Sequence, residues 1–134
     1  MYWRNTLKVT VNDIEEYLID VKTAVNADRY RIELNEKRQD NRDLFAEYVI
    51  SEKKQKEILL SLTAKDFSKI VPNEHKGYEH EMLYVFGKSI KLLRRFSSGE
   101  KPVSLYIKFN KTESQYVIVI SFHEQKYPLH YSFK

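Results

Sequence analysis

The chain has 134 residues, of which 42% are hydrophobic and 13% aromatic, and this composition is typical of one domain with a packed core. It has no cysteine, which excludes disulfides and thiolate chemistry, fits a reducing compartment and leads us to expect a cytoplasmic protein. No apolar run approaches the ~20 residues of a membrane helix and no apolar signal core lies near the N-terminus, so we expect no membrane partner.

The first segment with a clear pattern is helical. Asn12 followed by Glu15 matches a capping box, and the apolar residues after it recur at helical intervals, which predicts a helix over about residues 13–26. Residues 29–33 alternate in polarity and are a candidate short strand.

Two more helices are expected in the next part of the chain. Asp40 or Asn41 is a candidate cap for the second helix, and Ser51 for the third. The second helix would present one apolar stripe, made of Leu44, Phe45, Tyr48 and Val49. The third would direct its own apolar residues toward the core.

A break between helical and strand-like sequence follows. Thr63 and Asp66 repeat the capping pattern ahead of a short turn with Phe67 and Ile70. Residues 72–77 contain proline, asparagine and glycine, which is typical of a loop.

This loop separates a helical half (1–71) from a strand half (78–134). We expect both halves to form one domain, residues 1–134, because neither half could bury its apolar face alone. The expected fold class is α+β, with N-terminal helices packed on a small antiparallel C-terminal sheet.

The second half holds three strand-like runs. Residues 84–87 form the first run, and residues 103–109 alternate strictly, with apolar side chains at the odd positions. Residues 115–122 are nearly all apolar, as in a central strand, and His123 follows them.

Alternation places Tyr106 and Lys108 on the open face of this sheet, away from the helices. Whether His123 shares that face depends on the hairpin: a four-residue loop would place all three residues together, and a five-residue loop would separate them. Even in the favourable register Tyr106 would pair with Val119, about 13 Å along the strand from His123. A compact site would then need groups from another element.

Basic residues are concentrated between residues 87 and 111. This segment has seven basic residues and one acidic residue, Glu100, whereas the rest of the chain has 16 basic and 18 acidic residues. The seven are Lys88, Lys91, Arg94, Arg95, Lys101, Lys108 and Lys111. Like charges at this density repel each other without a ligand, so we expect an anionic partner for one face of the sheet.

Several segments from residue 58 onward resemble the MqsR-type toxins of bacterial toxin–antitoxin systems, small ribonucleases related in fold to the RelE toxins. The matching segments are ILLSLT (58–63), DFSK (66–69), YVFGK (84–88), LYIK (105–108) and VIVISFH (117–123). They occur in the order of the family, and the region over which they are spread, from residue 58 to the C-terminus, is a little over half of the chain. The first 57 residues match only in being helical.

The resemblance implies a RelE-like fold and roles for three residues. The family's active-site lysine corresponds to Lys69, its strand tyrosine to Tyr106 and its C-terminal basic residue to His123. That last position is a lysine in the namesake toxin, and the histidine found here can transfer a proton near neutral pH. A glutamine of the family site has no clear counterpart in residues 80–86.

The implied activity is that of a metal- and cofactor-independent endoribonuclease, an mRNA interferase that inhibits translation. It would cleave single-stranded mRNA, free or on the ribosome, and leave 2′,3′-cyclic phosphate and 5′-OH ends. His123 would transfer protons, Lys69 and Lys108 would stabilise phosphate charge, and Tyr106 would donate a hydrogen bond or stack on a base. The residues expected to bind RNA are Lys88, Lys91, Arg94, Arg95, Lys101 and Lys111.

A cognate antitoxin protein would cover the same basic face. An alternative interpretation is a non-catalytic RNA- or protein-binding module, including an inhibitor encoded by a mobile element. The histidines and acids of residues 74–81 match neither a zinc helix nor a zinc finger, so no metal site is expected.

Overall fold

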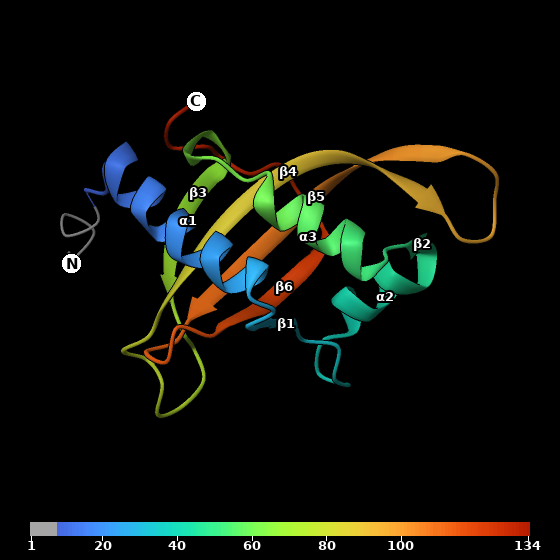
Figure 1. Cartoon of the computed structure of the whole chain (residues 1–134). Helices are drawn as coiled ribbons and strands as arrows, with labels where there is room; N and C mark the ends of the chain where they lie inside the picture. Colours follow the sequence, from blue (N-terminus) through green and yellow to red (C-terminus); the bar gives the residue numbers. More distant parts are fainter. Residues whose placement is uncertain (1–7) are drawn as a thin grey trace.

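The computed structural model describes residues 8–134, and Figure 1 shows how its elements are arranged. The helices are α1 (Val11–Asn26), α2 (Gln39–Glu47) and α3 (Glu52–Leu60), and a 3₁₀ turn (Ala64–Asp66) follows α3. The strands are β1 (Tyr30–Ile32), β2 (Tyr48–Val49), β3 (Phe67–Pro72), β4 (Met82–Arg94), β5 (Glu100–Lys111) and β6 (Val117–Glu124). Within residues 8–134, no helix combines the length and apolar composition needed to cross a membrane.

Helix α1 begins two residues before its expected start. Thr10 is the N-cap: its hydroxyl accepts a hydrogen bond from the Asp13 backbone N–H at 3.0 Å, and the Asp13 carboxylate accepts one from the Thr10 N–H at 3.0 Å. The expected cap at Asn12 is therefore wrong, because Thr10 and Asp13 form the same reciprocal pair earlier in the chain. Asn12 lies in the first turn, where its amide donates to Glu16.

Helix α2 forms in the expected place but without the expected caps. It starts after Arg38, which makes no capping hydrogen bond, and both Asp40 and Asn41 lie within its first turn. The expected apolar stripe is also shorter, because Tyr48 and Val49 leave the helix and form β2. The side chain of Asn41 is buried and forms hydrogen bonds with the backbone of β6 instead of capping the helix.

The other two expected caps are present. The Ser51 hydroxyl accepts a hydrogen bond from the Lys54 N–H at 3.1 Å and caps α3. The Asp66 carboxylate accepts one from the Thr63 N–H at 2.9 Å and closes the 3₁₀ turn.

Strand β3 replaces the expected turn at Phe67 and Ile70. These two residues are three apart, a spacing typical of a helix, yet both contact the same core. The reason is a β-bulge at Ser68, which shifts the pairing with β4 between Phe67 and Lys69. A bulge adds one residue and thereby gives a strand the local spacing of a helix.

The sheet has the order β1-β6-β5-β4-β2, and β3 also pairs with β4. The α+β class is confirmed, but the expected antiparallel sheet is wrong in one respect, since β1 pairs with β6 in parallel, Tyr30 opposite Val117. The other pairs are antiparallel. The sheet also includes β1, β2 and β3, all of which begin in the half expected to be helical. Sequence reasoning did not place them in the sheet, because the pairing partner of a short strand is not encoded in its local pattern.

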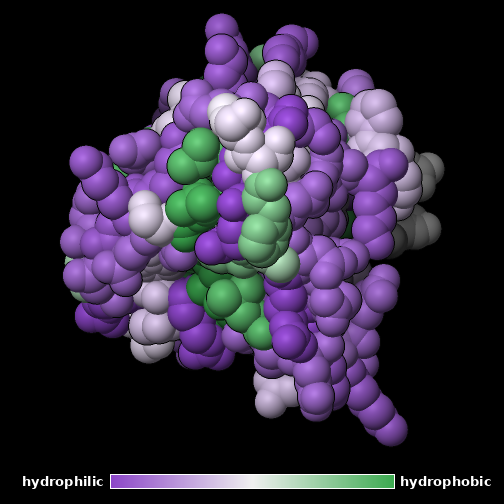
Figure 2. Space-filling model, turned by 90° about the vertical axis from the view of Figure 1, so that its right-hand side faces the viewer, coloured by the Kyte–Doolittle hydropathy of each residue, from purple (hydrophilic) through white to green (hydrophobic). Residues whose placement is uncertain are grey.

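The hairpin of β4 and β5 extends beyond α2 at the right of Figure 1. We call residues 91–101 the arm. Figure 2 views this end of the molecule and shows hydrophobic surface gathered among hydrophilic residues. Phe96 in the turn of the arm is 89% exposed, and the paired residues Val49 and Leu93 are partly exposed.

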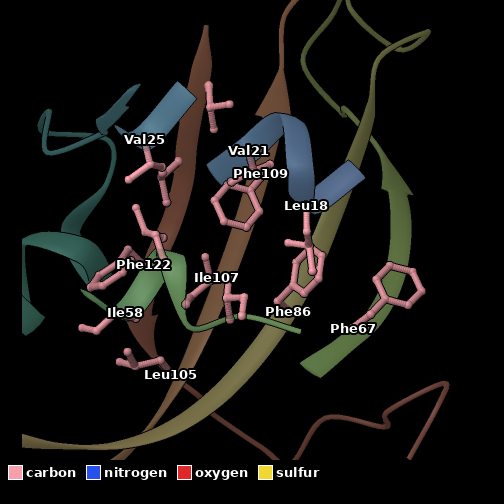
Figure 3. Close-up of a cluster of buried hydrophobic side chains, with 14 of the residues drawn as sticks. Leu18, Val21, Val25, Ile58, Phe67, Phe86, Leu105, Ile107, Phe109 and Phe122 are labelled. Carbon is pink, nitrogen blue, oxygen red and sulfur yellow. The ribbon is translucent and has the colours of Figure 1, made fainter. Parts of the chain in front are cut away.

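The hydrophobic core joins α1 and α3 to one face of β4, β5 and β6. The odd residues of β5 point into it as the alternation predicts, and Leu105 and Ile107 are fully buried. Each such side chain contributes about 1.5–3 kcal/mol when buried. Figure 3 shows part of this cluster, including Leu18, Val21, Val25, Ile58, Phe86, Leu105, Ile107, Phe109 and Phe122. We call the opposite face of the sheet the open face.

The hairpin of β5 and β6 has neither of the two expected registers. Its loop is residues 112–116, and Phe109 pairs with Val119 while the next β5 residue, Lys108, pairs with Ser121. Ile120 is therefore the extra residue of a β-bulge. A one-residue shift reverses the faces of all later side chains, so the bulge decides which β6 residues reach the open face.

The tail after β6 crosses the open face toward β3. The Gln125 N–H donates to the carbonyl of Ser104 at 2.7 Å, and the Ser68 hydroxyl donates to the carbonyl of His130 at 2.7 Å. Gly87 of β4 is in contact with this tail, and a side chain at that position would clash with it. The atoms that a Cβ would meet belong to Gln125, Leu129 and Tyr131.

Candidate active site on the open face of the sheet

Tyr106 and His123 lie side by side on the open face. They are direct cross-strand partners, and their rings are parallel within 9° with centroids 5.1 Å apart. The expected separation of about 13 Å is wrong, because the loop and the bulge at Ile120 shift the register. Without the bulge Tyr106 would pair with Phe122, and His123 would point into the core.

Asn41 holds the bulge in place. Its amide nitrogen donates to the carbonyl of Ile120 at 2.9 Å, and its amide oxygen accepts from the Phe122 N–H at 2.8 Å. The same nitrogen donates to the carbonyl of Glu33 at 2.8 Å, and the side chain is only 1% exposed. A bulge leaves backbone groups outside the ladder, and this amide supplies both a donor and an acceptor for them.

Two lysines extend the site across the sheet. Lys108 is two residues from Tyr106 on β5 and faces the same side, about 6.8 Å along the strand. Val85 on β4 pairs with Lys108 on one side and with Lys69 of β3 on the other. Two strand spacings therefore separate the Cα atoms of the lysines, about 10 Å.

The electrostatic environment of Lys108 is distinctive. Burial lowers the pKa of its ammonium group below the ordinary value, and the positive charges of Arg38 and Lys69 lower that pKa further, while Glu74 opposes the shift. Three cationic side chains are thus close enough to interact. A phosphate group that bound among them would relieve this repulsion.

The ring atoms of the central pair have defined roles. Burial is the main cause of a raised Tyr106 pKa, and Tyr127 raises it further, so the hydroxyl stays protonated at neutral pH and can donate. His123 Nδ1 lies 2.9 Å from the carbonyl oxygen of Glu124. A carbonyl oxygen only accepts, so Nδ1 carries the hydrogen and Nε2 is the atom that can take up a proton.

A cavity of about 740 Å³ lies on the open face, beside Tyr106 and Lys108. The open face is its floor, and its walls are the β3–β4 loop, which extends below the sheet in Figure 1, and the segment between β1 and α2. Tyr106 and Lys108 line it, whereas His123 lines a neighbouring hollow of about 270 Å³ with Asp40 and Lys126. Each member of the stacked pair therefore lines a different hollow.

Sequence reasoning missed several residues of this cavity. Asn110 continues the even-numbered series of β5 on the open face, so the alternation of the strand is the signal that could have found it. Glu81 and His75 belong to the acidic and histidine-containing segment 74–81, whose pattern suggests only a metal site. Arg38 carries no local signal, since only the tertiary fold brings it to Lys108.

Three of the residues expected to bind RNA have partners within the protein. Lys88 is ion-paired with Asp66 at 3.2 Å, and Lys111 with Asp20 at 2.6 Å. Arg95 donates to two backbone carbonyls near the end of α2, at 2.9 and 3.1 Å. These three side chains connect the sheet to other elements. Lys91, Arg94 and Lys101 are further exposed cations of the arm.

Comparisons with protein-family models, with curated proteins and with solved structures found no match for this chain.

Proposed function

We propose that the chain is a metal-independent endoribonuclease with a RelE-like fold, the toxin of an MqsR-type toxin–antitoxin system. The observation that carries the proposal is the stacked pair of Tyr106 and His123, with Lys108 beside it on the same face. Such a site supplies a proton acceptor, a hydrogen-bond donor and cations without a cofactor.

Cleavage would proceed by attack of the RNA's own 2′-oxygen on phosphorus. His123 Nε2 takes the proton of the 2′-OH, and the P–O5′ bond breaks as the 2′-oxygen bonds to phosphorus. The Tyr106 hydroxyl donates a hydrogen bond to the phosphate, and Lys108 and Lys69 stabilise its charge. Lys108 protonates the leaving 5′-oxygen, since its lowered pKa makes it a stronger acid than an ordinary lysine. The products are a 2′,3′-cyclic phosphate and a 5′-OH.

The substrate in this proposal is single-stranded mRNA, because a nucleotide must leave its base stack to enter the cavity. Cleavage would inhibit translation, and an antitoxin covering the open face would prevent it. The exposed arm with Phe96 favours a second candidate, a module that binds RNA or protein without chemistry.

The test compares cleavage of labelled RNA by the wild type, by His123→Ala and by His130→Ala. His130 is exposed, and its hydrogen bond with Ser68 uses its backbone carbonyl rather than its imidazole, so it serves as the matched control. We expect His123→Ala to lower the rate about 10²–10⁴-fold with an unchanged melting temperature, and His130→Ala to cleave normally. Equal rates for all three proteins would contradict the assigned role. RNA binding without cleavage by the wild type would favour the binding module.

A further inference from the structure

We propose that the 740 Å³ cavity binds the nucleotide next to the scissile phosphate and selects a base that carries an exocyclic amino group. This inference rests on the proposed function and adds a substrate preference to it. The volume lies within the ~300–1,000 Å³ of typical small-molecule sites.

The cavity holds both positive charge and hydrogen-bond acceptors. Lys108 and Arg38 supply the positive charge, which Glu74 offsets in part. Asn110, two residues further along β5 on the same face, is hydrogen-bonded to Glu81. A nucleotide has the matching polarity, with an anionic phosphate separated by its sugar from a base that offers hydrogen-bond donors.

Glu81 is held in a fixed orientation by two amides. Its Oε1 accepts hydrogen bonds from the Nδ2 atoms of Asn73 and Asn110, each at 3.0 Å. Each carboxylate oxygen accepts about two such bonds, so Oε1 is fully used and Oε2 is left to accept from a ligand. Asn110 has donated through its nitrogen, so its oxygen is a second acceptor. A group that is oriented in advance loses little entropy on binding.

This arrangement distinguishes between bases. The amino groups of cytosine, adenine and guanine are donors that can meet Glu81 Oε2, whereas uracil presents a carbonyl oxygen in the position of the cytosine amino group. The carbonyl oxygen of uracil would therefore lie opposite the Glu81 carboxylate, and two acceptors cannot form a hydrogen bond with each other. His75 and Tyr78 also line the cavity, their rings 5.8 Å apart, and provide aromatic surface against which a base can pack.

The test uses octamers of 2′-O-methylcytidine and of 2′-O-methyluridine, whose blocked 2′-oxygens prevent cleavage. Homopolymers present the same base in every register and carry equal phosphate charge. Fluorescence anisotropy should show that the wild type binds the cytidine octamer about 5-fold or more tightly than the uridine octamer. Equal affinities, or no binding of either octamer, would overturn the inference.

The decisive variant is Glu81→Gln. Its amide oxygen can still accept from Asn73 and Asn110, while its amide nitrogen donates where Oε2 accepted, so the preference should disappear or reverse. Glu79→Gln is the matched control, because this substitution removes the same charge from the same loop at a residue that does not line the cavity. A cytidine preference that survives in Glu81→Gln, or that is lost in Glu79→Gln, would contradict the assignment.

Failure of the two proposals can be told apart. If unmodified RNA is cleaved but the octamers bind equally, only the base preference is wrong. If the cytidine preference is present and depends on Glu81 but RNA is never cleaved, the cavity assignment stands and the endoribonuclease is wrong.

Discussion

Asn41 is hydrogen-bonded to the bulge that sets which face of the sheet His123 occupies. Its amide bonds to both sides of the Ile120 bulge, and the bulge is the one-residue shift that puts His123 rather than Phe122 beside Tyr106. A buried side chain with no exposed chemistry thus sets the geometry of the candidate site.

Replacing Asn41 by leucine is expected to lower the free energy of unfolding by about 1–3 kcal/mol, because backbone groups of the bulge would lose their partners in the core. NMR should also show changed ring-proton shifts for Tyr106 and His123, since their stacking depends on the register. Arg42→Ala, at the exposed neighbouring position of α2, is the control and should change neither. Unaltered ring shifts in Asn41→Leu would contradict the role given to this residue.

Lys108 gives the site a distinctive pH dependence. Its pKa in the folded chain is lowered by burial, by Arg38 and by Lys69, with Glu74 opposing, so it loses its charge before an ordinary lysine does. The affinity for uncleavable RNA should therefore fall as the pH rises through this lowered pKa, below 10.5. In the same interval the unfolded chain holds more protons, so the contribution of Lys108 to stability rises with pH.

The matched variant is Lys108→Arg, because arginine keeps its charge over this range. Its affinity should persist to higher pH than that of the wild type. Superimposable affinity–pH profiles would show that Lys108 does not contact the phosphate.

At the scale of the element, the C-terminal tail packs against part of the open face. The tail can approach the sheet closely at Gly87 because this residue has no Cβ. A Cβ there would lie 2.8 Å from both Gln125 Nε2 and Leu129 Cδ1 and would also clash with the Tyr131 hydroxyl. The same tail brings Tyr127 close enough to influence the pKa of Tyr106.

Gly87→Ala should displace this tail. We expect a loss of about 1–3 kcal/mol in stability from overpacking, together with faster proteolysis of the last ten residues. Lys91→Ala changes an exposed residue of the same strand and is the control. If Gly87→Ala matches the control in both measurements, the tail does not depend on the glycine.

At the scale of the whole molecule, local patterns predicted local structure. The helical spacing before Asn26 and the strict alternation of β5 correctly gave α1 and the buried face of the sheet, because both depend on neighbours in the sequence. The same alternation placed Tyr106 and Lys108 on the open face.

What the sequence did not reveal depends on distant contacts. The bulge at Ile120 needs Asn41, which is far away in the chain, and the parallel pairing of β1 needs β6. The bulge at Ser68 gave Phe67 and Ile70 of β3 the spacing of a helix. Arg38 joins the site only through the tertiary fold, so no local pattern could include it.

The most direct test of the central claim is mass spectrometry of the ends that the purified protein leaves on single-stranded RNA in the presence of EDTA. A 2′-oxygen attack assisted by His123 should give 2′,3′-cyclic phosphate and 5′-OH ends, and chelation should not slow it. Intact RNA, or fragments with 5′-phosphate and 3′-OH ends, would contradict the assignment of the open face as a metal-independent ribonuclease site.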